Sequence, residues 1–325
     1  MELKSLFTKQ KMMRTVLISL IPVSLAAVYF FGWRLLLIGL FVALAAVVSE
    51  YLVMRTIQKE KVKISEAAWV SAVLFTLTLP PETPIWVAVV GIVFGIVFGK
   101  AVFGGFGKNI FNPALVGRCF IYIAFPAHMT MGWAQPYAGL PGGFAQWLPS
   151  QAADAVSGAT PLIALEKSGT LTPLWNMFLG NVGGSVGETS AILILLCGAY
   201  LLYKKVASWQ IMASTIGSGL VLSAVLYYTG AAPVPPLFFV LSGGFLFGAV
   251  FMATDPVSAP KPKPVHWWYG ALIGLSTVII RSYGLFTEGV MFAILIANAL
   301  TPLMELKYKQ YDQKRKQALK KEAVA

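Results

Sequence analysis

The residues that could carry the most specific chemistry lie between Asp154 and Thr160. Ser157, Gly158 and Ala159 have small side chains, so they leave the Thr160 hydroxyl accessible to an enzyme that acts on hydroxyl groups. The proline that follows cannot donate a ladder hydrogen bond, which keeps this segment out of a β-sheet. Asp154 offers an acidic contact for such an enzyme. The segment is therefore a candidate attachment site, although an ordinary turn before a short helix would use the same residue types.

Three polar residues elsewhere are further candidates for binding. Arg118 falls near the middle of an apolar run, where an arginine costs at least about 2.5–3.5 kcal/mol on insertion scales. It therefore needs a partner, which could be an anionic ligand, a carboxylate of the second half of the chain, or backbone carbonyls. Asn112 opens the same run and could cap a helix or help a broken helix to hold an anion or an ion. Asp255 precedes a proline; it could handle an ion or proton, or it could end a helix as a cap.

Other polar features are less specific. Residues 183–187 contain three glycines and could form a phosphate-binding nest or a flexible turn. Glu50, Glu66 and Glu288 lie near the ends of apolar runs, where a charge can reach water, so no role is assigned to them. The two histidines and two cysteines have no metal-binding spacing, so no metal site is predicted.

The composition places these candidates in a membrane protein. Hydrophobic residues make up 57% of the chain, charged residues 12%, and the mean hydropathy is +0.73. A net charge of +12 would suggest nucleic acid as a partner of a soluble protein, but here the charges follow membrane topology, so nucleic-acid binding is rejected. We predict an all-α polytopic protein with ten transmembrane segments: 14–32, 34–54, 65–79, 84–103, 109–126, 190–203, 208–229, 236–254, 267–282 and 287–304.

The distribution of basic residues predicts how these segments are oriented. Most Lys and Arg residues, Lys100 among them, lie in connections that are cytoplasmic if the N-terminus is inside. Both termini are then cytoplasmic, and the long loop that carries Thr160 is extracytoplasmic. Five segments precede this loop and five follow it, so the second half is inverted relative to the first. The predicted parts are a first repeat (1–126), the loop (127–189), a second repeat (190–305) and a basic tail (306–325).

Two further patterns agree with a pair of inverted repeats that contain broken helices. The third segment is too short for a complete span and ends at Pro80-Pro81, and the eighth ends at Asp255. A constant offset also aligns Gly91 with Gly270 and Gly95 with Gly274.

The run Asp154-Ala155-Val156-Ser157-Gly158-Ala159-Thr160 resembles the flavinylation motif of membrane subunits that carry FMN on threonine through a phosphoester. That family contains the B subunit of the sodium-pumping NADH:quinone oxidoreductase and the D subunit of the Rnf electron-transport complex. The stretches 109–115, 183–190 and 252–258 are similar to the same family, so the resemblance covers essentially the whole chain. The family is built as five plus five segments.

The resemblance implies a covalent FMN on Thr160, attached by a separate flavin transferase. FMN would supply the redox chemistry, and the protein would supply position and electrostatics. A non-covalent riboflavin is a further implication, and Asp255 is the candidate for an ion pathway. The other expected cofactor-binding residues are Asp154, Ser157, Gly158, Ala159, Arg118 and Asn112. The protein would lie in the cell inner membrane, with the other membrane and peripheral subunits of a translocating oxidoreductase as partners.

Within this family the small number of residues before the first segment favours the Rnf D subunit. That choice implies electron flow between ferredoxin and NAD⁺, coupled to Na⁺ or H⁺ transport and relayed by the flavin. No dinucleotide fingerprint is visible, so ferredoxin and NAD⁺ would be handled by partner subunits. The alternatives are the B-type subunit of the Na⁺-pumping oxidoreductase and, in another class, a five-plus-five transporter or channel without flavin.

Overall fold

The computed structural model describes residues 7–58, 63–137, 139–148, 160–284 and 288–322. Four of the predicted site residues, Asp154, Ser157, Gly158 and Ala159, lie outside the described residues. The described part is mainly helical, and a short parallel pairing joins β1 (Phe7–Thr8) to β2 (Ile64–Ser65). The ten predicted segments all coincide with helical elements, whose bounds follow.

The first half contains α1 (Lys11–Phe31), α2 (Arg34–Gln58), α3 (Ala67–Leu77), α4 (Ile85–Gly99) with η2 (Ala101–Phe103), and α5 (Pro113–Ala124). The connection between the halves contains α6 (Pro126–Thr130), η3 (Gly142–Ala145), α7 (Pro161–Ser168) and α8 (Leu174–Leu179). The second half contains α9 (Ala191–Tyr203), α10 (Trp209–Tyr228), α11 (Pro236–Leu241), α12 (Phe245–Phe247), η4 (Gly248–Met252), α13 (Lys263–Tyr283) and α14 (Val290–Glu322).

The lengths of the helices support a polytopic membrane protein. Among the described residues, five helices are long and apolar enough to cross a membrane: Lys11–Phe31, Arg34–Ile57, Ile85–Phe103, Trp209–Tyr228 and Val290–Lys320. In contrast α3, α5 and α9 have 11, 12 and 13 residues, or roughly 16–20 Å at 1.5 Å per residue. These three are shorter than a hydrocarbon core of about 30 Å, so ten complete spans are not established.

Helix α2 illustrates how one helix faces both the protein core and lipid. Ile38, Val42 and Ala46 recur every fourth residue and are at most 1% exposed. Leu36 and Leu40, on the opposite side of the helix, are 60% and 54% exposed. A periodic row of exposed leucines is unfavourable in water but suits a surface in contact with lipid.

The eighth predicted segment is interrupted. Helix α11 ends at Leu241, Gly243 adopts a left-handed φ of 57°, and the chain then continues through α12 into the π-helical turn η4. The main break is therefore at residues 242–244, well before the predicted end at Asp255. Such interruptions are tolerated in membrane proteins where neighbouring groups satisfy the freed backbone atoms.

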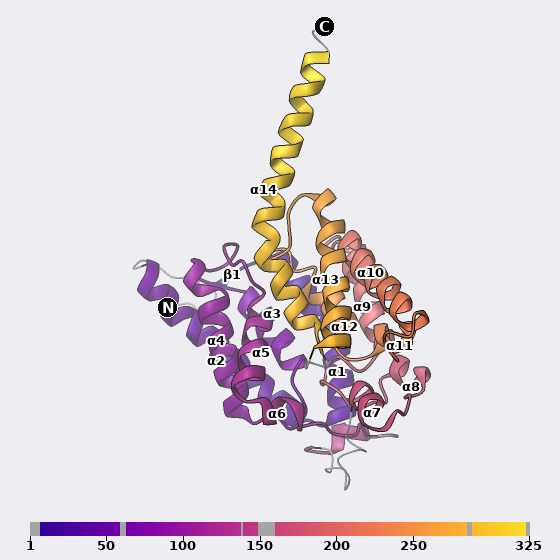
Figure 1. The fold of residues 1–325 in the computed structure, drawn as a ribbon. Helices are drawn as coiled ribbons and strands as arrows, with labels where there is room; N and C mark the ends of the chain where they lie inside the picture. The colour runs from indigo at the N-terminus through magenta and orange to yellow at the C-terminus, as the bar shows by residue number, and fades with distance from the viewer. Residues whose placement is uncertain (1–6, 59–62, 138, 149–159, 285–287, 323–325) are drawn as a thin grey trace.

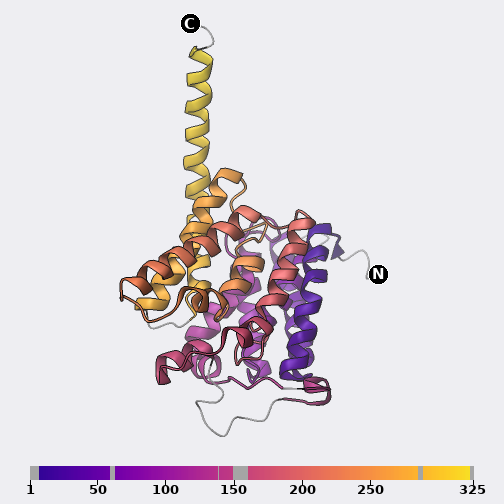
Figure 2. The ribbon, with the colours of Figure 1, turned by 90° about the vertical axis from the view of Figure 1, so that its right-hand side faces the viewer.

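Helices of both halves pack against one another, and α14 extends far beyond the body at one end (Figure 1). Helices α6, α7 and α8 lie at the other end, as Figure 2 also shows. Two backbone hydrogen bonds tie the connection to the end of α3, from Val186 N to Leu79 O (3.1 Å) and from Gly187 N to Leu77 O (2.8 Å). The end of the body opposite the α14 extension is thus built from residues far apart in the sequence.

The glycines aligned by the sequence offset contact different partner helices. Gly91 and Gly95 pack α4 against α5, whereas Gly270 and Gly274 pack α13 against α10. These contacts explain why the positions require small residues. They do not themselves establish an inverted repeat, which stays a prediction.

Candidate functional site

Thr160 begins α7 and caps it. Its hydroxyl oxygen accepts a hydrogen bond from Ile163 N at 3.3 Å, and Pro161 occupies the first helical position. The ordinary interpretation of this segment, a turn before a short helix, therefore describes its local structure. An ester oxygen keeps lone pairs that can accept the same hydrogen bond, so helix capping and attachment of a group to Thr160 are compatible.

Thr160 lines a small pocket with a cavity volume of about 20 Å³. The pocket walls come from five separate segments: the region after α6, the start of α7, the connection between α8 and α9, the break after α11, and the residue before α14. The lining residues are Trp133, Thr160, Pro161, Leu162, Val182, Gly183, Gly184, Ser185, Glu188, Thr189, Leu241, Gly243 and Glu288. The glycine-rich segment 183–187, which the sequence singles out, thus lies next to Thr160.

Arg118 lies beneath this pocket and contacts three residues that line it. Its side chain comes from α5 and forms a close ion pair with Glu288, together with a 3.4 Å hydrogen bond to Ser185 Oγ. Its Nη1 lies 3.8 Å from Oε1 of Glu188. Arg118 is 2% exposed. The partners that such a buried arginine requires are the carboxylates of Glu188 and Glu288. Neither carboxylate belongs to the first five predicted segments.

A second arginine, Arg281 of α13, stabilises the broken segment at the same pocket. It donates hydrogen bonds to the carbonyl oxygens of Phe239 (3.0 Å), Ser242 (3.2 Å) and Glu288 (3.2 Å). Its guanidinium also lies 4.8 Å from the centroid of the Phe239 ring, a cation–π distance. Sequence reasoning assigned Arg281 no role, because the backbone carbonyls that it binds become available only where the helix breaks.

Asn112 and Asp255 line a different pocket, with a cavity volume of about 30 Å³, which shares no lining residue with the Thr160 pocket. Asn112 caps α5 by accepting from Ala114 N at 3.0 Å. Asp255 accepts a 2.8 Å hydrogen bond from Ser258 Oγ. Asn112 thus caps a helix, and Asp255 forms an Asx-type turn by also accepting from Val257 N (3.4 Å) and Ser258 N (3.3 Å). The structure therefore separates the sequence candidates into two sites.

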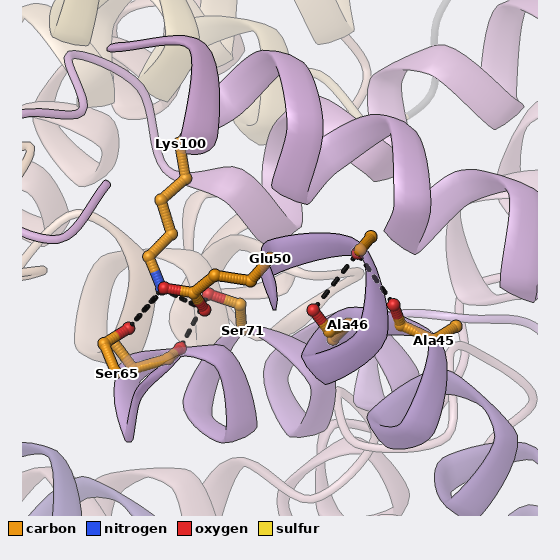
Figure 3. Close-up of polar contacts among 8 residues, drawn as sticks. Ala45, Ala46, Glu50, Ser65, Ser71 and Lys100 are labelled. Atoms are coloured by element: carbon orange, nitrogen blue, oxygen red, sulfur yellow. Dashed lines mark hydrogen bonds and ion pairs between the residues drawn. The ribbon is translucent and has the colours of Figure 1, made fainter. Parts of the chain in front are cut away.

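Lys100 also lines this second pocket and belongs to a buried polar network (Figure 3). Its Nζ donates to Glu50 Oε2 at 2.9 Å and to Ser65 Oγ at 2.5 Å, and Ser65 Oγ donates to Glu50 Oε1 at 2.9 Å. Lys100 is 1% exposed and Glu50 is 2% exposed. The prediction that Glu50 reaches water at the end of its segment is therefore wrong, and Lys100, in the connection that follows α4, is buried as well.

The other two acids to which the sequence gave no role also have cationic partners. Glu288 pairs with Arg118, as described above. Glu66, before α3, accepts hydrogen bonds from Arg14 at 2.5–3.1 Å. Hydrophobic patterning along a segment cannot reveal these pairs, because their members are far apart in the sequence.

Asn298 of α14 joins the two halves beside the second pocket and gives a testable prediction. Its Oδ1 accepts from Asn112 N (3.1 Å), and its Nδ2 donates to Tyr269 OH (2.7 Å). Asn298→Leu leaves these buried groups without partners, so the free energy of unfolding should fall by about 1–3 kcal/mol. Thermal unfolding of the purified protein in detergent would measure the loss. Asn181→Leu, at an exposed position, is the control, and equal midpoints for the two variants would contradict the prediction.

The chain is similar to known proteins along most of its length. Residues 3–313 match the model of the NQR2, RnfD, RnfE family. Three similar curated proteins are each named as the B subunit of a Na(+)-translocating NADH-quinone reductase. The Pseudoalteromonas atlantica protein is 42% identical over 79% of this chain, that of Yersinia pestis 39% over 79%, and that of Pseudomonas aeruginosa 41% over 75%. The chain covers 60–63% of the length of these relatives.

Proposed function

The chain belongs to the NQR2, RnfD, RnfE family, and we propose that it is a membrane subunit of an ion-translocating oxidoreductase, similar in type to the B subunit of the Na⁺-translocating NADH-quinone reductase. The names of the similar curated proteins support this choice. They favour the B-type alternative over the Rnf D subunit, which was the expectation from the sequence. The partners are then the other subunits of such a complex.

The second part of the proposal is that Thr160 carries FMN through a phosphoester. The observation that supports it most is the position of Thr160 at the mouth of a pocket with glycine-rich walls. Gly183, Gly184 and Gly243 contribute backbone without side chains, and a Cβ on Gly243 would stand 3.3 Å from Leu162 Cδ1. The walls beside Thr160 therefore present backbone in place of side chains, which suits the close approach of a tethered group.

FMN, when bound, supplies the redox chemistry, and the chain supplies its surroundings. Thr160 would fix the attachment point at the start of α7. Leu162, Val182 and Leu241 would cover apolar surface of the group and exclude water, while Ser185 lies where the pocket meets Arg118. The attachment itself requires a flavin transferase, for which Asp154 and residues 157–159 are the proposed recognition segment.

The second pocket is the proposed place for a non-covalent riboflavin. Asn109, Asn112, Asp255 and Lys100 give it hydrogen-bond donors and acceptors, and Met13 and Leu74 give it apolar walls. The proposed orientation, with the Thr160 pocket extracytoplasmic and both termini cytoplasmic, follows from the distribution of basic residues. It agrees with the positions of α7 and the extension of α14 at opposite ends of the body (Figure 1).

Thr160→Ala tests the proposed attachment. We expect the parent chain, expressed with a flavin transferase, to give a fluorescent band after denaturing electrophoresis, and we expect Thr160→Ala to give a dark one. The reason is that a phosphoester survives denaturation whereas a non-covalent flavin is released. Thr170→Ala is the matched control, because Thr170 is exposed and does not line the pocket. A dark parent band, with a transferase proven active on another substrate, would favour a transporter without flavin.

A further inference from the structure

The pocket that contains Thr160 holds two polar atoms with unused hydrogen-bonding capacity. Oε2 of Glu188 is buried and has no hydrogen-bond partner among the described residues. The same is true of Nε1 of Trp133. Both residues line the pocket. Buried polar atoms without partners are rare in proteins, so these two atoms are available to a ligand.

The Glu188 carboxylate is held in place by the surrounding structure. Glu188 is 9% exposed, and Arg118 Nη1 lies 3.8 Å from its other oxygen, Oε1. On the opposite side the carboxylate lies against the backbone of Gly244, where an added Cβ would be 2.9 Å from Oε2. The other charged groups near it are Glu288 and Arg281. The carboxylate therefore lies between the Arg118 guanidinium and the Gly244 backbone.

The pair of atoms has a defined chemical character. A carboxylate oxygen accepts hydrogen bonds, and an indole N–H only donates them. The pyrimidine edge of a flavin ring presents an imide N–H between two carbonyl oxygens. Glu188 can accept from that N–H, and Trp133 can donate to a neighbouring carbonyl. An apolar pocket would offer neither a hydrogen-bond acceptor nor a donor to this edge of the ring.

We propose that Glu188 and Trp133 bind the imide edge of the flavin tethered at Thr160 and thereby fix the orientation of its ring. The inference rests on the proposed attachment of FMN. Arg118 acts through Glu188, because its guanidinium attracts the carboxylate across 3.8 Å. Neither Glu188 nor Trp133 was among the predicted cofactor-binding residues.

The two contacts should shift the midpoint potential of the flavin in opposite directions. A carboxylate beside the ring disfavours added electron density, so Glu188→Gln should raise the potential. An N–H donor at a ring carbonyl stabilises added electron density, so Trp133→Phe should lower it. A hydrogen bond that involves a charged group changes an equilibrium roughly tenfold or more, which corresponds to about 59 mV for a one-electron couple.

The experiment is a spectroelectrochemical titration of the full chain carrying covalent flavin, for the parent, Glu188→Gln and Trp133→Phe. Glu166→Gln is the matched control, because Glu166 is an exposed acid on α7 that does not line the pocket. In-gel fluorescence measures attachment, and thermal unfolding measures folding, independently of the potential. We expect all variants to retain covalent flavin and only the two pocket variants to change its potential.

Unchanged potentials in both pocket variants, with covalent flavin retained, would overturn the proposed contacts and leave the attachment intact. A shift of equal size in Glu166→Gln would overturn them too, because it would reflect the loss of a distant charge. If the parent chain carries no covalent flavin, the proposed function itself fails, and this inference fails with it. If Glu188→Gln does not fold, Trp133→Phe alone decides, because it keeps an aromatic ring in the pocket.

Discussion

Replacing Lys100 by methionine should lower the free energy of unfolding by about 3–5 kcal/mol, because it leaves one member of a buried ion pair without its partner. Lys100 and Glu50 are each at most 2% exposed, and Ser65 bonds to both (Figure 3). Without the ammonium group, the Glu50 carboxylate keeps, among the described residues, the Ser65 hydroxyl alone, which cannot offset the removal of a charge from water. The variant must therefore bear this desolvation cost.

The unfolding of Lys100→Met can be measured with a thiol-reactive dye in detergent. Both cysteines are free, Cys197 is buried and Cys119 is partly buried, so their reaction reports loss of structure. Lys108→Met is the matched control, because Lys108 is exposed in the following loop, and its midpoint should stay close to that of the parent.

The double variant Lys100→Met with Glu50→Gln separates two explanations for the loss. Glutamine removes the charge but can still accept from Ser65, so the double variant should recover most of the stability lost in Lys100→Met. A midpoint of Lys100→Met equal to that of the parent would contradict a structural role for the pair. A double variant no more stable than Lys100→Met would mean that packing of the lysine stem, and not the charge, determines the loss.

The positions of the helices could be predicted from the sequence because hydrophobic runs and their boundaries are local properties. Each predicted segment contains a helical element, and Asn112 caps α5 where its position before a proline suggests. What patterning does not give is whether an apolar helix crosses the membrane completely. Helix α3 has only 11 residues. The elements that pack against this helix, and not its own hydropathy, determine whether it contacts lipid or protein.

The break at residues 242–244 shows why local pattern was insufficient. The sequence from 236 to 254 is apolar almost throughout and predicts one helix. Arg281 of α13 binds the backbone carbonyls of Phe239 and Ser242, and these groups become available because the helix stops there. The compensating residue is about 40 positions away in the sequence, which no window of hydropathy can include.

Only the part of the candidate site that depends on a local pattern could be predicted from the sequence. Thr160 was found from its small neighbours, which are local, and the structure places it beside the glycine-rich segment 183–187. Glu188 and Trp133 could not be assigned from the sequence, because their importance depends on unpaired buried atoms in a pocket built from separate segments. The signal that could have found Glu188 is its position directly after those glycines, within a stretch that the family resemblance includes.

The close contact between α10 and α13 gives the second prediction with a large effect on stability. A Cβ on Gly274 would stand 2.8 Å from the backbone nitrogen of Gly219 and also too close to the Thr215 carbonyl. Backbone atoms cannot rotate away as a side chain can, so Gly274→Ala must push the helices apart. Separation would also lengthen the 3.3 Å hydrogen bond from Ser218 Oγ to Ala271 O, which crosses the same interface. We expect a loss of about 1–3 kcal/mol or more in the free energy of unfolding.

The control for this variant is Gly217→Ala on α10, which makes the same chemical change. A Cβ on Gly217 would meet nothing within 4 Å. Alanine is favoured over glycine in a helix by roughly 0.5–1 kcal/mol, so the two substitutions should move the unfolding midpoint in opposite directions. The opposite signs matter because a general effect of alanine on helix propensity would stabilise both variants. If Gly274→Ala proved as stable as Gly217→Ala, α10 and α13 would not be in backbone contact, and the close packing of these two helices would be wrong.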